Sequence, residues 1–157
     1  MKKILYIIMI SVFILVGCSE TSGSKDFVDY EKEKVVNSLN DLSFDPEIPK
    51  LLPFEPTETE IDMRGIGGVE NSFIIVTFMS ENQGEITFQA GLGINAIDFT
   101  EEKVTISENL KGKYGVNDTT KILKWDKNDI YYELLVDSDS ISRNEVLEIA
   151  KSLYKVN

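Results

Sequence analysis

Histidine is absent from the sequence, which removes the side chain most often used for proton transfer near neutral pH and the commonest metal ligand. The only cysteine is Cys18, so an internal disulfide is impossible. Catalysis by Ser-His or Cys-His pairs and ordinary zinc sites are therefore excluded. Chemistry based on carboxylates, lysine, tyrosine or oxygen-ligated calcium and magnesium remains. We expect a binding protein that is not an enzyme and has no catalytic residues, metal or cofactor.

Positive charge is also scarce, with 16 Lys and Arg side chains against 27 Asp and Glu side chains and a formal charge of −11. Nucleic-acid binding depends on neutralising phosphates with basic side chains, so this balance argues against a nucleic-acid partner. The same charge repels anionic lipid headgroups, which keeps a folded domain off such a surface.

Long apolar runs are missing except near the start of the chain. Met1-Lys2-Lys3 precedes an apolar stretch from Ile4 to Val16 that only Ser11 interrupts, and the sequence turns polar from Ser19. This stretch has 13 residues, whereas crossing a bilayer takes roughly 20 apolar residues. A basic start, a short apolar stretch and small residues after it are typical of a secretory signal peptide. We expect residues 1–17 to be that signal.

The signal ends in Leu15-Val16-Gly17-Cys18, which resembles the lipobox of bacterial lipoproteins. The resemblance implies cleavage between Gly17 and Cys18 and attachment of a diacylglyceryl group, with palmitate-type chains, to Cys18. Two or more acyl chains hold a protein stably on a membrane, because each buried methylene contributes about 0.8 kcal/mol. We expect the protein on the extracytoplasmic face of the cell membrane.

Cleavage leaves 140 residues with 14 basic and 27 acidic side chains, because Lys2 and Lys3 are lost, and a formal charge of −13. This length suits one domain. We expect residues 18–25 to comprise the lipidated cysteine and a Ser/Gly-containing tether. We expect residues 26–157 to form a single domain.

The first third of this domain predicts a helix followed by extended chain. Val28, Val35, Leu39 and Leu42 form one apolar stripe over residues 26–42. All four prolines lie between residues 46 and 56, interleaved with large apolar residues, which predicts an extended segment held against the core. Charged residues 57–64 indicate an edge strand.

The middle of the chain predicts strands and one loop. Residues 73–78 are nearly all apolar, as in a strand covered on both faces or nearly so. Ile86, Phe88, Ala90 and Leu92 alternate with polar or small residues, which predicts one buried face, and Gly91 and Gly93 indicate a bulge or curvature. Val104 and Ile106 mark a short strand, and residues 109–117 predict a loop.

The last third predicts a hairpin and a helix. Residues 122–125 and 130–136 alternate as two strands around the turn 126–129, with Trp125 as a core anchor. Ser142 and Glu145 have the spacing of a capping box, and an apolar stripe follows. The pattern predicts an α+β fold in which an N-terminal and a C-terminal helix pack on a curved antiparallel sheet.

The hairpin residues 122–125 and 130–134 and the helix residues 142–153 resemble a domain of unknown function. This domain occurs in extracytoplasmic lipoproteins and anti-sigma-factor-like membrane proteins of Gram-positive bacteria. The proline-containing segment at residues 48–53 also resembles the start of this domain. The resemblance therefore covers residues 44–154, and it implies no catalytic residues. A looser architectural resemblance is to half-barrel lipoprotein carriers and sensors that hold lipid in a curved sheet.

Two polar clusters allow alternative interpretations. Asp137, Asp139 and Ser140 suit either oxygen ligation of calcium or, as we favour, a turn leading into the helix. Asp98, Glu101 and Glu102 suit either the acid and base of a glycosidase or, again favoured, a solvated link between strands.

Three functions follow for the chain. The main hypothesis is a non-catalytic surface lipoprotein that binds a protein or an envelope component, with the membrane itself contacted through lipid on Cys18. The alternative is a carrier or sensor of an apolar ligand against the curved sheet, and the remote one is a carboxylate-based hydrolase. The ligand-binding residues stay unassigned at this point.

Replacing Cys18 with serine removes the only thiol that can carry lipid, so we expect fatty-acid incorporation to be lost. The measurement is metabolic labelling of expressing cells with alkyne-tagged palmitate and detection of label on the purified chain. Ser19→Ala is the matched control, because it alters the neighbouring position and keeps the thiol. Label retained after Cys18→Ser, or none on the unaltered chain, contradicts the lipobox interpretation.

Overall fold

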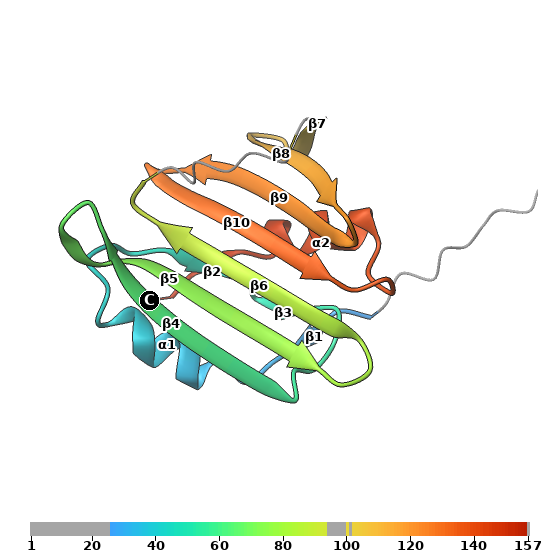
Figure 1. Ribbon diagram of the computed structural model, residues 1–157, viewed down its shortest axis with the longest axis horizontal. Coiled ribbons are helices and arrows are strands. Elements are labelled where there is room, and N and C mark those ends of the chain that lie inside the picture. Colours follow the sequence, from blue (N-terminus) through green and yellow to red (C-terminus); the bar gives the residue numbers. More distant parts are fainter. Residues whose placement is uncertain (1–25, 94–99, 101, 157) are drawn as a thin grey trace, which may run out of the picture.

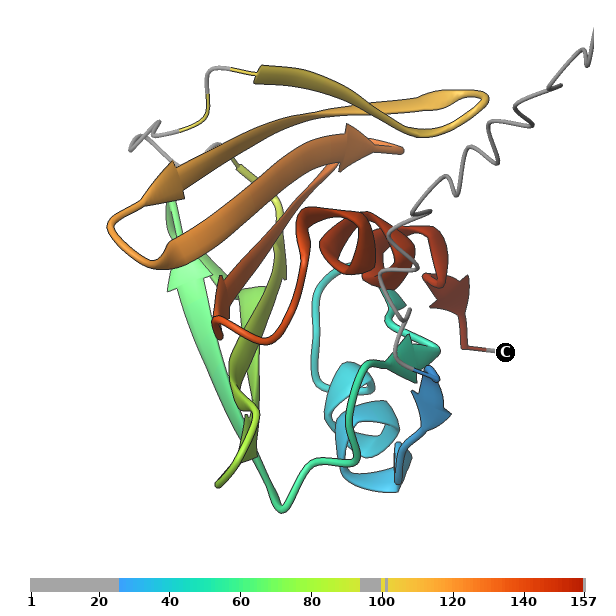
Figure 2. The ribbon, with the colours of Figure 1, turned by 90° about the vertical axis from the view of Figure 1, so that its right-hand side faces the viewer.

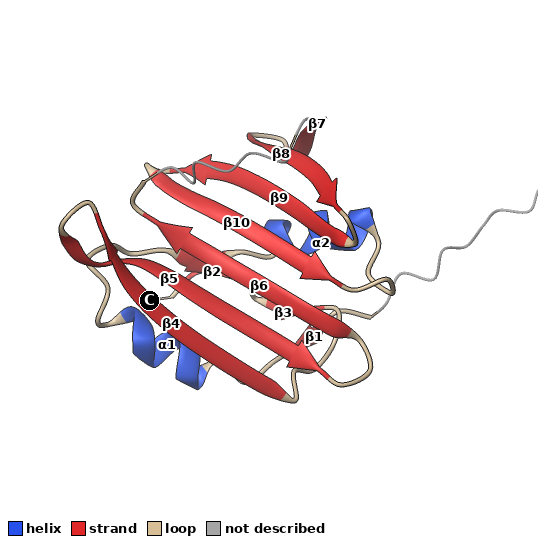
Figure 3. Cartoon of the chain, in the orientation of Figure 1, coloured by secondary structure: helices blue, strands red, loops and turns tan. Residues whose placement is uncertain are grey.

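The computed structural model describes residues 26–93, 100 and 102–156, which form an α+β fold dominated by antiparallel sheet (Figures 1 and 3). The strands are β1 Val28–Asp29, β2 Glu47–Ile48, β3 Leu51–Leu52, β4 Glu58–Ile66, β5 Val69–Ser80, β6 Gly84–Gly91, β7 Glu102–Ser107, β8 Leu110–Asn117, β9 Thr120–Lys127, β10 Ile130–Asp137 and β11 Tyr154–Lys155. The helices are α1 Glu33–Leu39 and α2 Arg143–Lys151. Neither is long and apolar enough to cross a membrane.

Seven strands form the main sheet in the order β4-β5-β6-β10-β9-β8-β7, and every neighbouring pair is antiparallel. β10 pairs with both β6 and β9, so the strand of this sheet that comes last in the sequence lies at its centre. The chain crosses from β6 to the far edge at β7 and returns strand by strand. Figure 2 shows that the sheet bends around α2, so its concave side is the inner face.

The core lies on this inner face. Alternate residues of the central strands point inward and are fully buried: Ile74, Val76, Phe78, Ile86, Phe88, Ala90, Leu134 and Val136. Burying a large apolar side chain stabilises a fold by about 1.5–3 kcal/mol, so this set is a main source of stability. The outer face of residues 73–78 is less completely covered than the inner face, because Phe73, Ile75 and Thr77 are only half-buried there.

The C-terminal helix begins as predicted. The Glu145 backbone N–H donates to Ser142 Oγ at 3.3 Å, and the Ser142 backbone N–H donates to Glu145 Oε2 at 2.6 Å, which completes the capping box. Val146, Ile149 and Ala150 are buried, and α2 contacts β7, β9 and β10.

The N-terminal helix is shorter than predicted, because the first residues pair as a strand. Val28 of β1 lies opposite Leu52 of β3, and α1 begins only at Glu33. Tyr30, between them, is buried, and its hydroxyl donates to the Pro49 carbonyl at 2.8 Å. The proline segment is extended as predicted, with β2 and β3 as its only regular pieces among the described residues.

The structure corrects one prediction about a glycine-containing segment and narrows another. Residues 109–117 are not a loop: β8 occupies most of them and bonds to β7 and β9 on its two sides. Gly91 is not at a bulge, because it pairs in register with Phe73 and Tyr131. A Cβ at Gly91 would lie 2.2 Å from Phe73 Cδ2, so glycine makes room there for the Phe73 ring.

The structure also tests the predictions for Leu92, the last hairpin and Trp125. Leu92 is half exposed and is not part of the buried face of β6. The predicted hairpin is confirmed as β9 and β10, joined through Asn128 and Asp129, whose φ angles of 55° and 62° suit a tight type I′ turn. Trp125 is buried, as predicted for a core anchor.

Ser142→Ala removes the side-chain half of the α2 cap, so we expect the free energy of unfolding to fall by about 1 kcal/mol. Urea denaturation followed by circular dichroism measures it. Ser107→Ala, an exposed serine in β7, is the control and is expected to change stability by less than about 0.5 kcal/mol. Equal effects of the two substitutions would show that the cap contributes nothing measurable.

Gly91→Ala places a methyl group against the Phe73 ring, and we expect a loss of about 1–3 kcal/mol of stability. Phe73→Leu in the same chain shortens the obstructing side chain, so the double variant is expected to lose less than the sum of the two single variants. Thermal unfolding of the four chains gives this coupling. Strict additivity would mean that the ring is not what excludes a side chain at position 91.

Candidate functional site

A large cleft lies between α1 and the outer edge of β4. It has a volume of about 610 Å³, and residues from the α1 region and from the chain entering β4 line it: Tyr30, Glu31, Lys34, Glu55, Pro56, Thr57, Glu58, Thr59 and Glu60. β4 is the first strand of the main sheet and pairs with β5 on one side only. The cleft therefore runs along a strand edge that no other strand of the described chain occupies.

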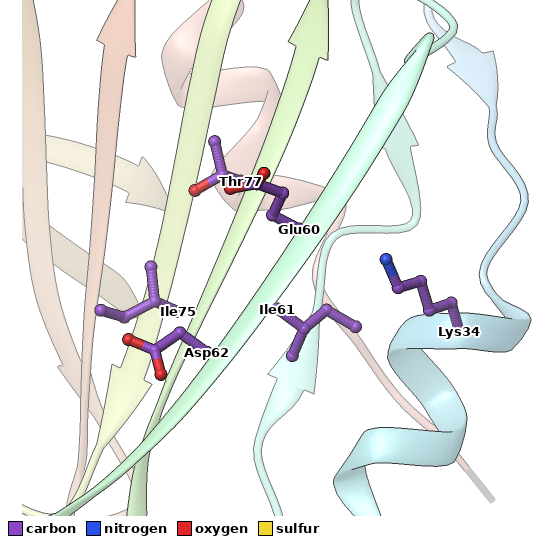
Figure 4. Close-up of a pocket in the computed structure, with 6 residues that line it drawn as sticks. All are labelled: Lys34, Glu60, Ile61, Asp62, Ile75 and Thr77. Carbon is purple, nitrogen blue, oxygen red and sulfur yellow. The ribbon is translucent and has the colours of Figure 1, made fainter.

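A smaller cleft of about 300 Å³ adjoins it and shares Lys34 and Glu60 with it. Figure 4 shows Lys34 reaching from α1 toward β4, while Glu60 and Asp62 lie on the side of β4 that carries Ile75 and Thr77. The register agrees, because Glu60 lies opposite Thr77 and Asp62 opposite Ile75. We call the two clefts together the β4 groove.

The charge of the β4 groove is strongly negative. Its carboxylates are Glu31, Glu55, Glu58, Glu60 and Asp62, all exposed, and Lys34 is its only basic lining residue. Within the described chain, only Asp62 of these acids forms an ion pair, with Arg64 at 2.6 Å.

The other four carboxylates of the groove have no salt-bridge partner among the described residues, and the Lys34 ammonium donates to the backbone carbonyl of Thr59. Four carboxylates thus remain for an external cation.

Tyr30 forms a rigid part of the groove. Its ring packs edge-on against Phe78 with centroids 5.0 Å apart, and its hydroxyl is held by the Pro49 carbonyl. Burial, reinforced by the nearby Tyr154, raises the pKa of Tyr30 well above its usual value. The phenol stays neutral at physiological pH, so it acts as a fixed wall rather than as a base.

The predicted acidic cluster before α2 forms a hydrogen-bonded turn. Asp137 Oδ1 accepts from Thr119 at 3.2 Å, and Ser140 lies 3.0 Å from the Ser138 hydroxyl. Over residues 26–93, 100 and 102–156, no group of three or more His, Cys, Asp or Glu is placed to hold a metal ion. Asp137 ends β10, and Asp139 and Ser140 lie between this strand and α2, where polar side chains suit the start of a helix.

The second predicted cluster is only partly described. Asp98 and Glu101 lie outside the described residues, as do Gly17 and Cys18. Glu102, at the start of β7, forms an ion pair with Arg143, which also lies 5.3 Å from the centroid of the Tyr114 ring. Glu102 therefore helps to join β7 to the start of α2.

Sequence reasoning identified the charged edge strand but not the groove. Glu58, Glu60 and Asp62 lie in the charged segment 57–64 that was predicted as an edge strand, whereas Glu31 and Lys34 approach them only because the chain folds back. The missing information was the position of α1 beside β4.

Comparison with known proteins supplies a family. The chain matches the family described as a domain of unknown function (DUF4367) over residues 67–153, which span the strands from β5 to β10 and α2. No curated protein and no solved structure matches the chain. The proline segment and the β4 groove lie mainly before the matched residues. Because the match covers more than half of the sequence, the chain belongs to the DUF4367 family.

Proposed function

We propose that the protein is a non-catalytic lipoprotein, anchored through Cys18 to the extracytoplasmic face of a Gram-positive cell membrane, whose domain binds a protein partner in the β4 groove. One observation carries the proposal: five carboxylates from separate chain segments line an unpaired strand edge. In this arrangement α2 packs on the inner face of the curved sheet, and the edge of β4 stays accessible.

The negative charge and the unpaired strand edge of the β4 groove favour a partner segment that is basic and extended. An edge strand offers backbone donors and acceptors to a further strand, and charged side chains along it block indiscriminate pairing. Carboxylates at the rim attract lysine and arginine and speed association. A segment that alternates basic and small polar residues would satisfy both features.

The packing of the interior supports a binding module over a carrier of apolar ligands. Inward side chains such as Val76, Phe88 and Leu134 have no exposed surface. The groove has mostly polar residues along its rim. An apolar ligand site is instead expected to be concave and predominantly apolar.

A synthetic peptide of alternating lysine and threonine tests the proposal directly. We expect saturable binding to the full chain in detergent by isothermal titration calorimetry, weakening as salt is added because the groove charges are exposed. A peptide of alternating glutamate and threonine is expected not to bind. Equal heats from the two peptides would contradict a charge-selective groove.

Reversing two groove charges, with Glu58→Lys and Glu60→Lys together, is expected to weaken binding of the lysine peptide at least about tenfold. The matched control is Glu81→Lys with Glu108→Lys, which changes the net charge equally at exposed turns elsewhere. The control is expected to bind nearly as well as the unaltered chain. If both double variants lose affinity alike, attraction depends on overall charge and the β4 groove is not the site.

A further inference from the structure

The outer side of the β7–β8 hairpin carries lysines, although the chain as a whole is strongly acidic. Val104 of β7 and Tyr114 of β8 are buried on the inner side, and side chains alternate along a strand. Lys103 of β7 and Lys111 and Lys113 of β8 therefore point outward, and all three are exposed. We call these three residues the lysine face.

The strand register brings the lysines together. Lys103 lies directly opposite Lys113, and Thr105 lies directly opposite Lys111. Like charges directly opposite each other destabilise a pair of strands. Lys103 and Lys111 form no ion pair with any residue of the described chain. Like charges gathered at a cost to the sheet are typical of a binding surface, here one for anions.

The nearby acidic residues lie off the lysine face. Glu102 lies opposite the inward-pointing Tyr114 and forms an ion pair with Arg143 at the start of α2. Glu108 is in the turn between β7 and β8. Asp126 of β9 lies beyond the stretch in which β9 pairs with β8. The face itself is therefore positive.

The lysine face and the β4 groove lie at opposite edges of the same sheet (Figure 1). The seven strands leave six spacings between β4 and β7, which at about 4.8 Å each amount to about 29 Å along the sheet. Exposed charges are screened within about 8 Å at physiological ionic strength. The carboxylates of the β4 groove therefore do not cancel the lysine face, and the net charge of the chain does not decide what this face attracts.

We propose that the lysine face binds the anionic phospholipid surface of the membrane that carries the chain, an inference that rests on the lipid anchor of the proposed function. In this contact the three ammonium groups meet headgroup phosphates. Cys18 precedes Asp26 by eight residues, which limits the distance between them to about 28 Å. Lipid on Cys18 thus keeps the domain beside the membrane.

The strength of the contact selects a surface over a free anion. Each lysine near an anionic membrane strengthens attachment by about fivefold, so three lysines strengthen it by about a hundredfold. This is too weak to retain a dissolved anion, but it is sufficient to orient a domain that is already tethered, because tethering supplies a high effective concentration.

This orientation turns the β4 groove away from the bilayer. Figure 2 shows β7 and β8 at one end of the domain and α1, which lines the groove, at the other. With β7 and β8 on the membrane, the groove carboxylates lie far from the headgroup phosphates. The groove then opens toward a partner outside the membrane.

Trp125, the single tryptophan, reports the orientation without a label on the protein. It is buried in β9, next to β8, so its energy transfer to dansyl-labelled lipid rises as this side approaches the bilayer. The full chain, purified with its lipid from expressing cells, is reconstituted in vesicles of phosphatidylcholine alone or mixed with phosphatidylglycerol. We expect greater transfer on the mixed vesicles and loss of the difference in high salt.

Neutralising the lysine face, with Lys103→Gln, Lys111→Gln and Lys113→Gln together, is expected to remove the preference of about a hundredfold. Transfer on the mixed vesicles then falls to the value on phosphatidylcholine. The matched control changes the net charge equally by replacing three exposed lysines elsewhere with glutamine, and it is expected to keep the transfer of the unaltered chain: Lys50, Lys151 and Lys155. Equal losses in the two triple variants overturn the proposal.

Flotation of the vesicles separates failure of the orientation from failure of the anchor. A chain that floats with both kinds of vesicle and shows equal transfer on them overturns the orientation alone. A chain that floats with neither contradicts the anchor and this inference with it. If soluble glycerol phosphate abolishes the difference at constant ionic strength, the face binds single phosphate groups and not the bilayer, which also overturns the proposal.

Discussion

The inner face of the curved sheet must be covered, and the rest of the architecture follows from that need. Its inward side chains are apolar from β5 to β9, and leaving them in water would forfeit most of the hydrophobic stabilisation. α2 covers the half formed by β10, β9 and β7. On the other half, Tyr30 packs on Phe78, and Leu52 and Phe54 join the same buried cluster.

This division of the cover also determines where the β4 groove and a small cavity near the end of α2 lie. The N-terminal segments reach the sheet beside β4 and leave a groove along its edge, while the end of α2 leaves a small cavity beside Trp125. The family match spans β5 to α2, so it includes Trp125 and Ala150 but not Glu31, Lys34 or Glu58. The matched part thus comprises strands β5 to β10 and α2, and the β4 groove lies mainly in the region that precedes the match.

Prediction from the sequence was most successful for features that residues close together in the chain determine. The β9–β10 hairpin, the Ser142 cap and the edge position of β4 each depend on residues close together in the chain. β8 was not predicted because its glycines and lysines are not typical of a strand, and its pairing with β7 and β9 holds it in place. β1 was not predicted because Val28 pairs with Leu52, which is distant in the sequence. The close approach that requires glycine at position 91 was not predicted, because the Phe73 ring lies on another strand. The β4 groove and the Trp125 cavity escaped prediction for the same reason.

The central claim is that the edge of β4 pairs with a basic segment, and hydrogen exchange of backbone amides measures that pairing most directly. With the lysine–threonine peptide bound, strand addition predicts slower exchange at alternate residues of β4, since only every second residue of an edge strand points its N–H outward. β7, the other edge of the same sheet, serves as the internal reference and should be unchanged. Unaltered exchange in β4, or equal protection of β4 and β7, would contradict the account.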